Sequence, residues 1–139
     1  MKLTLKYFDT NILIHSVVNQ DEAKRKLSQK LITSAVKDKS IVISTLSIQE
    51  FVFVLNKLNL AIDVIDSRAN FFIQFVDFSI DKNIIAKAIS LCAKMKNYKN
   101  INDAVHLCFA EKYCEDFVTF DKDFKKLLTF SELNIQILK

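Results

Sequence analysis

The chain has 139 residues, the size of one domain and too short for two, so we treat residues 1–139 as a single domain. Half of the residues are hydrophobic and 26% are charged, as in a globular protein that needs no disulfides or structural metal to hold its core. It contains neither glycine nor proline. This excludes glycine-rich phosphate loops, the nucleophile elbow and the EF-hand loop, and it argues against tight all-β hairpins.

Strand and helix patterns alternate along the chain. In chain order the patterns predict a strand at 3–8, helices at 10–18 and 21–36, a strand at 41–43, helices at 45–58 and 62–73, a strand at 75–78, a helix at 81–95, a basic loop at 96–102, a helix at 103–113, a strand at 117–120, a short helix and a strand at 135–137. Because helices separate the strands, we expect an α/β fold with a parallel sheet of four to five strands, covered on both faces.

The sequence gives no sign of export or of a membrane. No apolar stretch approaches the ~20 residues that a membrane helix needs, and Asp9 and Asn11 interrupt the apolar N-terminal segment. Cys92, Cys108 and Cys114 form no C-x-x-C pair, and an odd number argues against a disulfide framework. Cys92 and Cys108 lie on apolar helical stripes, which indicates buried thiols. We therefore expect a cytoplasmic protein.

Four acids occupy positions where ligands bind in such folds. Asp9 directly follows the first predicted strand, and Asp121 directly follows the strand at 117–120. Ligands of parallel sheets bind at the carboxyl ends of the strands, which lie ~4.8 Å apart when they are neighbours. Glu50 and Asp103 lie near the starts of helices, in otherwise apolar surroundings. Together the four acids predict a negatively charged site at one sheet edge.

Each acid also has a purely structural explanation. Asp9 would cap the helix that follows it. Ser47 and Glu50 have the spacing of a capping box. Asp103 would interact with the positive end of its helix, and Asp121 would belong to an ordinary turn.

Four segments, in the same order, resemble PIN-domain ribonucleases, and most of all the small VapC-type toxins of toxin–antitoxin systems. They are residues 8–14 (FDTNILI), 43–51 (ISTLSIQEF), 102–107 (NDAVHL) and 118–124 (VTFDKDF). The resemblance implies a three-layer α/β/α sandwich and metal-dependent cleavage of RNA. The chain departs from the family pattern at residues 113–116, where it lacks the glycine that commonly ends the helix before this strand.

The resemblance also implies roles for particular residues. It implies an acidic quartet that binds metal and carries out catalysis: Asp9, Glu50, Asp103 and Asp121. Asn11 and Thr119 would be polar supports, and Asp123 an auxiliary acid. His106 lies three positions after Asp103 on the same helix face, so it either supports the site or packs in the core.

Clustered carboxylates of this kind call for a cation. Two carboxylates ~4 Å apart repel each other by ~4 kcal/mol at an effective dielectric constant near 20, so a cluster takes up protons or binds a cation. Oxygen ligands prefer Mg²⁺ or Mn²⁺, which activate water for hydrolysis of a phosphodiester. We expect Asp9, Asp103 and Asp121 to be the primary ligands. Glu50 would be a further ligand or would position the water.

The charge balance fits a polyanionic substrate. Without these four acids, the chain has 20 basic and 12 acidic side chains. Four lysines near Asp103 and Asp121 are predicted to contact the RNA backbone: Lys96, Lys99, Lys122 and Lys125. Lysine-rich stretches are also typical of ordinary solvated faces.

We expect RNA as substrate, an antitoxin protein as partner, a homodimer, and no association with membranes. Apolar residues on the helices at 45–73 would suit self-association or an antitoxin helix. A phosphoaspartyl enzyme is excluded because Asn11 stands where its second acid would be. The alternative that stays open is a catalytically silent PIN-like module that binds RNA or a protein.

Overall fold

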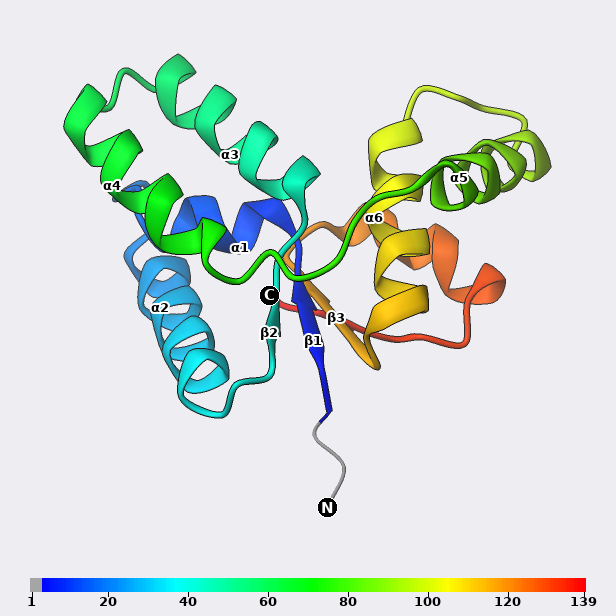
Figure 1. The fold of residues 1–139 in the computed structure, drawn as a ribbon, viewed down its shortest axis with the longest axis horizontal. Coiled ribbons are helices and arrows are strands. Elements are labelled where there is room, and N and C mark those ends of the chain that lie inside the picture. Colours follow the sequence, from blue (N-terminus) through cyan, green and yellow to red (C-terminus); the bar gives the residue numbers. More distant parts are fainter. Residues whose placement is uncertain (1–3) are drawn as a thin grey trace.

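Four parallel strands form the centre of the structure, a computed structural model that describes residues 4–139 (Figure 1). The strands are β1 (Lys6–Phe8), β2 (Ile41–Val42), β3 (Asp116–Thr119) and β4 (Asn134–Ile137). Their order in the sheet is β2-β1-β3-β4, and all three pairings are parallel. The predicted parallel sheet of four to five strands is therefore confirmed. Residue 3, the predicted start of the first strand, lies outside the described residues.

Helices cover both faces of this sheet. They are α1 (Thr10–His15), α2 (Glu22–Lys37), α3 (Thr45–Lys57), α4 (Ile62–Ile73), α5 (Lys82–Lys94), α6 (Ile101–Tyr113) and the 3₁₀ helix η1 (Lys122–Phe130). Helices α1 to α4 lie on one side of the sheet, and α5, α6 and η1 on the other (Figure 1). This is the expected three-layer α/β/α arrangement. None of the helices within residues 4–139 is long and apolar enough to cross a membrane.

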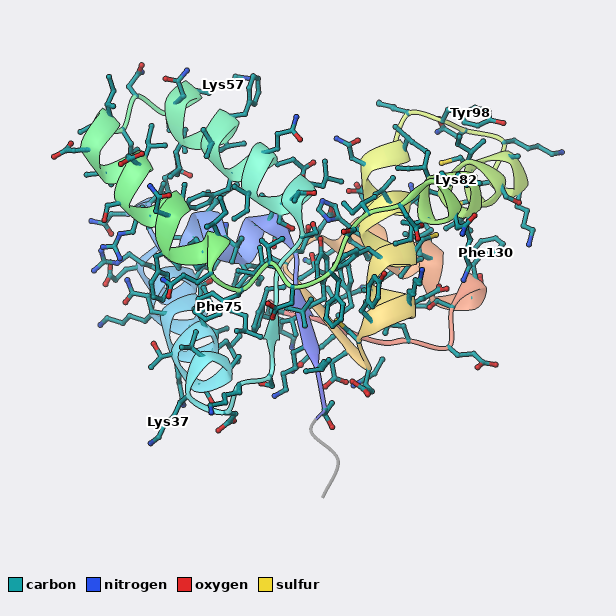
Figure 2. The ribbon with its side chains drawn as sticks, in the orientation of Figure 1. Lys37, Lys57, Phe75, Lys82, Tyr98 and Phe130 are labelled. Carbon is teal, nitrogen blue, oxygen red and sulfur yellow. The ribbon has the colours of Figure 1, made fainter. Side chains whose placement is uncertain are left out.

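Alternating side chains on the strands divide the core in two. Tyr7 and Phe117 face α5 and α6, whereas their neighbours Phe8 and Val118 face α1 to α4. The side chains fill the space between the sheet and both helical layers, while polar ones such as Lys37 project outward (Figure 2). All three cysteines are buried and free, as predicted for Cys92 and Cys108.

The strand predicted at residues 75–78 is wrong, because this segment has no strand structure. The segment connects α4 to α5, which lie on opposite faces of the sheet, so it passes across the sheet edge. One backbone hydrogen bond joins the Ile43 N–H to the Phe75 carbonyl at 3.3 Å. Phe78 instead stacks on Tyr113, with 4.3 Å between ring centroids. The apolar residues of the 75–78 segment therefore reflect packing and not strand pairing.

Two helix boundaries differ from the prediction by more than one residue. Helix α1 ends at His15 and not at residue 18, because the Ser16 hydroxyl donates to the Leu13 carbonyl at 2.6 Å and Ser16 caps the helix. Helix α6 begins at Ile101, inside the predicted loop. These two additional residues bring Asn102 onto the helix.

Three helices end in turns that usually contain glycine. Lys39, Asn59 and Lys96 follow α2, α3 and α5 and have left-handed φ values of 59°, 62° and 58°. In each turn, the second residue after the helix C-cap donates its backbone N–H to the carbonyl five residues earlier. Ser40 N–H, for example, donates to the Ala35 carbonyl at 2.9 Å. This is the Schellman motif, in which glycine is favoured because it has no Cβ. The chain builds it without glycine and bears the conformational cost.

We expect Lys39→Gly to raise the free energy of unfolding by about 0.5–1 kcal/mol, because the left-handed conformation costs a residue with a Cβ ~1–2 kcal/mol and part of this gain is lost to the flexibility of glycine in the unfolded chain. Urea denaturation measures the change. Lys30→Gly, in the exposed middle of α2, is the matched control and should lower stability by about 1 kcal/mol. Equal losses in both variants would contradict the explanation.

Candidate functional site

The four acids of the predicted quartet line one cavity. Asp9 follows β1, Asp121 follows β3, and these two strands pair side by side. Glu50 lies on α3, which follows β2, and Asp103 lies on the first turn of α6. The cavity has a volume of about 630 Å³, and its other walls include apolar residues of α1 and α3. The structure thus brings together side chains that are up to 112 residues apart, counting from position 9 to position 121.

Asp9 is the most deeply buried of the four acids, with a relative exposure of 6%. Its Oδ1 accepts the backbone N–H of Thr10 at 2.8 Å, and its Oδ2 accepts the Thr119 hydroxyl at 2.7 Å and the Asn11 amide at 3.1 Å. Burial raises the pKa of Asp9, while His106 and these hydrogen bonds act in the opposite direction. The helix-capping explanation is correct for this residue, but it accounts for only one of the three hydrogen bonds.

The carboxylate of Glu50 is held by three donors. Its Oε1 accepts the Thr10 hydroxyl at 2.7 Å and His106 Nε2 at 2.6 Å, and its Oε2 accepts the Asn102 amide at 3.2 Å. Burial alone would raise the pKa of Glu50, but the hydrogen bond and positive charge of His106 outweigh it and lower the pKa. The carboxylate is therefore ionised at neutral pH.

The capping-box explanation of Glu50 is wrong. Helix α3 is capped by Ser44, whose Oγ accepts the backbone N–H of Ser47 at 3.1 Å. Ser47 thus occupies the third helical position, where a capping box would have its acid. Glu50 lies one turn further along and points into the cavity instead of toward the helix end.

Asp103 is the acid with the fewest compensating contacts. Its carboxylate accepts no hydrogen bond within residues 4–139. Burial and the negative charges of Asp9, Asp121 and Glu50 raise its pKa to about 6, despite the opposing influence of His106. A carboxyl group in this state binds a proton or a cation readily. The helix cap of α6 is Asn100, so Asp103 lies in the first turn, where the helix dipole favours an acid.

The predicted supports surround these acids. The Thr119 hydroxyl donates to Asp9 and accepts the backbone N–H of Asp121 at 2.9 Å, so it links the ends of β1 and β3. Asn11 donates to both Asp9 and Thr119. The Asp121 side chain accepts the backbone N–H of Asp123 at 2.9 Å and begins η1, which matches the turn explanation, yet it also lines the cavity. Asp123 itself lines a small adjoining hollow of about 30 Å³ that Asp103 also borders.

His106 is buried, with a relative exposure of 1%, and it contacts Glu50 directly. Burial alone would lower its pKa, but the hydrogen bond to Glu50 and the charges of Asp9, Glu50 and Asp103 raise it. The two expectations for this residue, packing and support of the site, therefore both describe its environment.

The four predicted RNA-binding lysines are exposed, but none of them lines the acidic cavity. Lys96 and Lys99 precede α6, and Lys122 and Lys125 lie on η1. The lysine that lines the hollow beside Asp103 is Lys126.

The donor set suits a divalent cation, although it is not gathered into a coordination shell. Four carboxylates share the cavity, and neither lysine nor arginine is among the described residues that line it. Such oxygen ligands match Mg²⁺ or Mn²⁺. Within residues 4–139, no three His, Cys, Asp or Glu side chains form a group with the geometry of a metal site. The four acids therefore share one cavity, as predicted, but their side chains are not arranged as a coordination shell.

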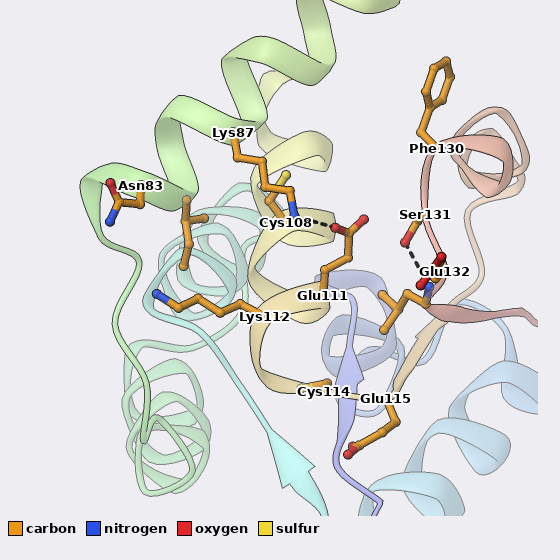
Figure 3. Close-up of a pocket in the computed structure, with 12 residues that line it drawn as sticks. Asn83, Lys87, Cys108, Glu111, Lys112, Cys114, Glu115, Phe130, Ser131 and Glu132 are labelled. Carbon is orange, nitrogen blue, oxygen red and sulfur yellow. Dashed lines mark hydrogen bonds and ion pairs between the residues drawn. The ribbon is translucent and has the colours of Figure 1, made fainter.

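A cavity larger than the acidic one lies elsewhere, between α5, α6 and the turn after η1 (Figure 3). It has a volume of about 730 Å³. Its lysines are paired with acids: Lys87 contacts Glu111 at 2.9 Å, and Lys112 contacts Asp81 at 3.2 Å. It contains none of the predicted site residues.

Sequence reasoning missed several polar residues that contact the acids or their partners. Thr10 donates to Glu50, and Asn102 donates to the same carboxylate. Tyr7 lies behind His106, with its hydroxyl 2.5 Å from Nδ1. Thr10 and Asn102 directly neighbour two of the acids in sequence, which was an available signal. Tyr7 lies inside an apolar strand and gave none.

Comparison with known proteins places the chain. Residues 6–127 match the PIN domain family. No curated protein matches the sequence significantly. The VapBC2 complex from Rickettsia felis, bound to a DNA fragment from its promoter, contains a chain of similar fold with a TM-score of 0.69 and 14% identity. VapBC-5 from Mycobacterium tuberculosis contains another, with a TM-score of 0.61 and 16% identity.

Both similarities extend over 97% of this chain and 99% of the other, and they concern the fold. The family match covers most of the sequence, including all four acids. The chain therefore belongs to the PIN domain family.

Proposed function

We propose that the protein is a metal-dependent endoribonuclease that hydrolyses RNA phosphodiester bonds, and that it acts as the toxin of a type II toxin–antitoxin pair. The observation that carries the proposal is the single cavity lined by Asp9, Glu50, Asp103 and Asp121. Family membership supports nuclease chemistry, and the structural neighbours support the toxin role. The chemical requirement of the clustered carboxylates supports Mg²⁺ or Mn²⁺.

In this proposal Asp9, Asp103 and Asp121 hold the metal, and Glu50 is a further ligand or orients the attacking water. A bound divalent cation supplies a water of lowered pKa and offsets charge on the phosphate. The protein's own contribution is orientation. Thr10, Asn11 and Thr119 fix the carboxylate of Asp9. Asp123 would assist from the adjoining hollow.

The Glu50 carboxylate is oriented in the same way. His106, Thr10 and Asn102 hold both of its oxygens, so rotation of the carboxylate is restricted. A carboxylate fixed in this manner can accept a proton from a water at a defined position. The proposed mechanism therefore forms no covalent bond between enzyme and substrate.

The substrate backbone would be bound outside the cavity. Lys96 and Lys99 precede the helix that carries Asp103, and Lys122 and Lys125 follow Asp121. Their exposed ammonium groups can contact phosphates without reading the sequence. Binding through these contacts would weaken as salt concentration rises.

A protein partner is supported by apolar residues on the surface of α3 and α4. Phe53, Ile62 and Ile73 are 67%, 85% and 53% exposed. Exposed apolar groups of this size are typical of association surfaces. We propose that an antitoxin and a second copy of the chain use the α3–α4 region.

The cleavage experiment uses the full chain, mixed RNA, and Mn²⁺ or Mg²⁺. We expect cleavage that a chelator abolishes, and a loss of about 100-fold or more in Asp103→Asn, because a ligand charge is removed from the cavity. Asp63→Asn is the matched control, since Asp63 is exposed on α4 away from the cavity, and it should retain activity. RNA binding without cleavage under any metal condition would favour the catalytically silent module.

Charge repulsion also predicts how Asp103 affects stability without metal. The pKa of Asp103 in the folded protein, about 6, exceeds the ordinary value of 3.8. Folding therefore favours the neutral carboxyl group. For this group, the free energy of unfolding is highest below pH 4 and falls as the pH rises through 6. Asp103→Asn should therefore match the wild type near pH 4 and exceed it by about 1 kcal/mol at pH 7. Two pKa units correspond to roughly 3 kcal/mol, which solvent screening reduces because the side chain is partly exposed.

Urea denaturation in the presence of chelator measures this difference across the pH range. Asp9→Asn is the informative comparison and should lose stability, because the buried Asp9 carboxylate accepts three hydrogen bonds whereas Asp103 accepts none within residues 4–139. A variant Asp103→Asn that is less stable than the wild type at pH 7 would show that the interaction of the ionised acid with the helix dipole outweighs the repulsion.

A further inference from the structure

The far side of His106 is held by a buried cluster of hydroxyl groups. Tyr7 has a relative exposure of 0%, and its hydroxyl lies 2.5 Å from His106 Nδ1. The same hydroxyl lies 2.7 Å from Ser44 Oγ and 2.8 Å from Ser47 Oγ. Both serines are also fully buried. Three hydrogen-bonding partners thus surround one phenol oxygen in the buried core.

The donors and acceptors of this cluster can be assigned from Glu50. Its carboxylate accepts the Thr10 hydroxyl and the Asn102 amide, so the imidazole atom that faces it must also be a donor. His106 Nε2 therefore carries a hydrogen. In the neutral ring, Nδ1 is then the acceptor, and the Tyr7 hydroxyl donates to it; in the positively charged ring, which the hydrogen bond to Glu50 and the neighbouring acids favour, Nδ1–H donates to the Tyr7 oxygen instead.

The two serines complete this arrangement. A phenol oxygen donates one hydrogen bond and accepts two. With its hydrogen directed to a neutral His106, the Tyr7 oxygen accepts one hydrogen bond from Ser44 and one from Ser47; opposite a charged His106 it accepts Nδ1–H and one serine hydroxyl and donates to the other serine. Every polar atom of the cluster is then satisfied, which matters because an unpaired buried polar group costs about 1–3 kcal/mol.

We propose that Tyr7, together with Ser44 and Ser47, is a positioning residue that fixes the ring of His106 with its Nε2–H directed at Glu50. Tyr7 would act on the cavity through His106 and would not touch substrate or metal. The effect on cleavage rests on the function proposed above, whereas the ring orientation and the hydrogen on Nε2 do not. The same strand thus supplies Asp9 to the cavity and, two residues earlier, the support for Glu50.

Nitrogen NMR of the wild-type imidazole is the direct test. Two-bond ¹H–¹⁵N spectra of the metal-free protein should show His106 protonated at Nε2, with a slowly exchanging hydrogen. The chain has two histidines, so His15→Gln assigns the signals. A ring that carries its hydrogen only on Nδ1 would overturn the proposal without any change at the cluster.

Tyr7→Phe then tests the role of the hydroxyl. We expect shifted His106 signals, faster exchange at Nε2, and affinity for Mn²⁺ alone reduced by about 10-fold, the lower end of the effect of losing a direct hydrogen-bond partner of a ligand, because Tyr7 acts on Glu50 through His106. For cleavage, kcat should fall by a similar factor while KM for RNA changes little. Unchanged histidine signals and unchanged Mn²⁺ affinity would overturn the proposal.

Phe109→Leu is the control for a merely structural effect. Phe109 is buried and packs 5.2 Å from the Tyr7 ring, but it takes no part in the hydrogen bonds. It should lower stability yet leave the His106 signals and Mn²⁺ affinity unchanged, and equal losses in both variants would contradict a positioning role. If Tyr7→Phe does not fold, Ser47→Ala tests the same cluster, since Ser44 still caps α3, and it should shift the His106 signals in the same direction.

Failure of the proposed function has a different signature. If the wild type cleaves no RNA but His106 carries a hydrogen on Nε2 and Tyr7→Phe weakens Mn²⁺ binding, the nuclease proposal fails and the positioning role stands. If the wild type cleaves RNA and Tyr7→Phe behaves like the wild type in all measurements, the nuclease proposal stands and the positioning role fails.

Discussion

Repulsion among four carboxylates in one cavity is the constraint on which the rest of the site depends. The parallel pairing of β1 with β3 makes the crowding unavoidable, because it directs Asp9 and Asp121 to the same sheet edge. The protein compensates unevenly. Asp9 and Glu50 each receive three hydrogen bonds, while Asp103 receives none within residues 4–139 and has a pKa of about 6. The remaining repulsion is what a cation would relieve.

The absence of glycine governs how the chain connects the elements that form this cavity. Left-handed residues are still needed where α2, α3 and α5 end, and Lys39, Asn59 and Lys96 supply them. Asparagine adopts this conformation at lower cost than lysine, because its short polar side chain hydrogen-bonds locally. Asn59 is a residue type that is enriched in such turns, whereas the two lysine turns carry no local sequence signal. A surface lysine looks the same in a sequence whether its φ is negative or positive.

Much of the fold followed from hydrophobic patterning, and the departures have physical causes. Strand and helix alternation was sufficient for the parallel sheet and both helical layers. The segment 75–78 imitated a strand because Phe75 and Phe78 pack against neighbouring elements while the chain crosses the sheet edge. An apolar run reports burial, and burial alone does not distinguish strand pairing from the packing of a connection.

For the site, the sequence was most informative about residues at strand ends and least informative about residues behind them. Asp9 and Asp121 could be located because parallel topology fixes where strand ends meet. Glu50 was ambiguous, since the choice between a capping box and the cavity depended on whether Ser44 or Ser47 capped the helix. The role of Tyr7 could not be predicted, because a tyrosine in an apolar strand indicates core packing. Tyr7 does pack in the core, in addition to its hydrogen bonds. Its hydroxyl acquires partners from α3 and α6 only when those helices pack on the sheet.

This division between rigid and compliant acids bears on how the cavity would accept a cation. Asp9 and Glu50 have few conformations open to them, because each carboxylate accepts three hydrogen bonds that its movement would break. Asp103 gives up no such bond when it moves, and it gains most from an added positive charge. Ligand binding in this cavity would therefore displace mainly Asp103, on the exposed first turn of α6, while the Asp9 and Glu50 side remains fixed. An incomplete coordination shell is the expected arrangement of mutually repelling carboxylates before a cation binds, with the hydrogen-bonded half defining where a cation would lie.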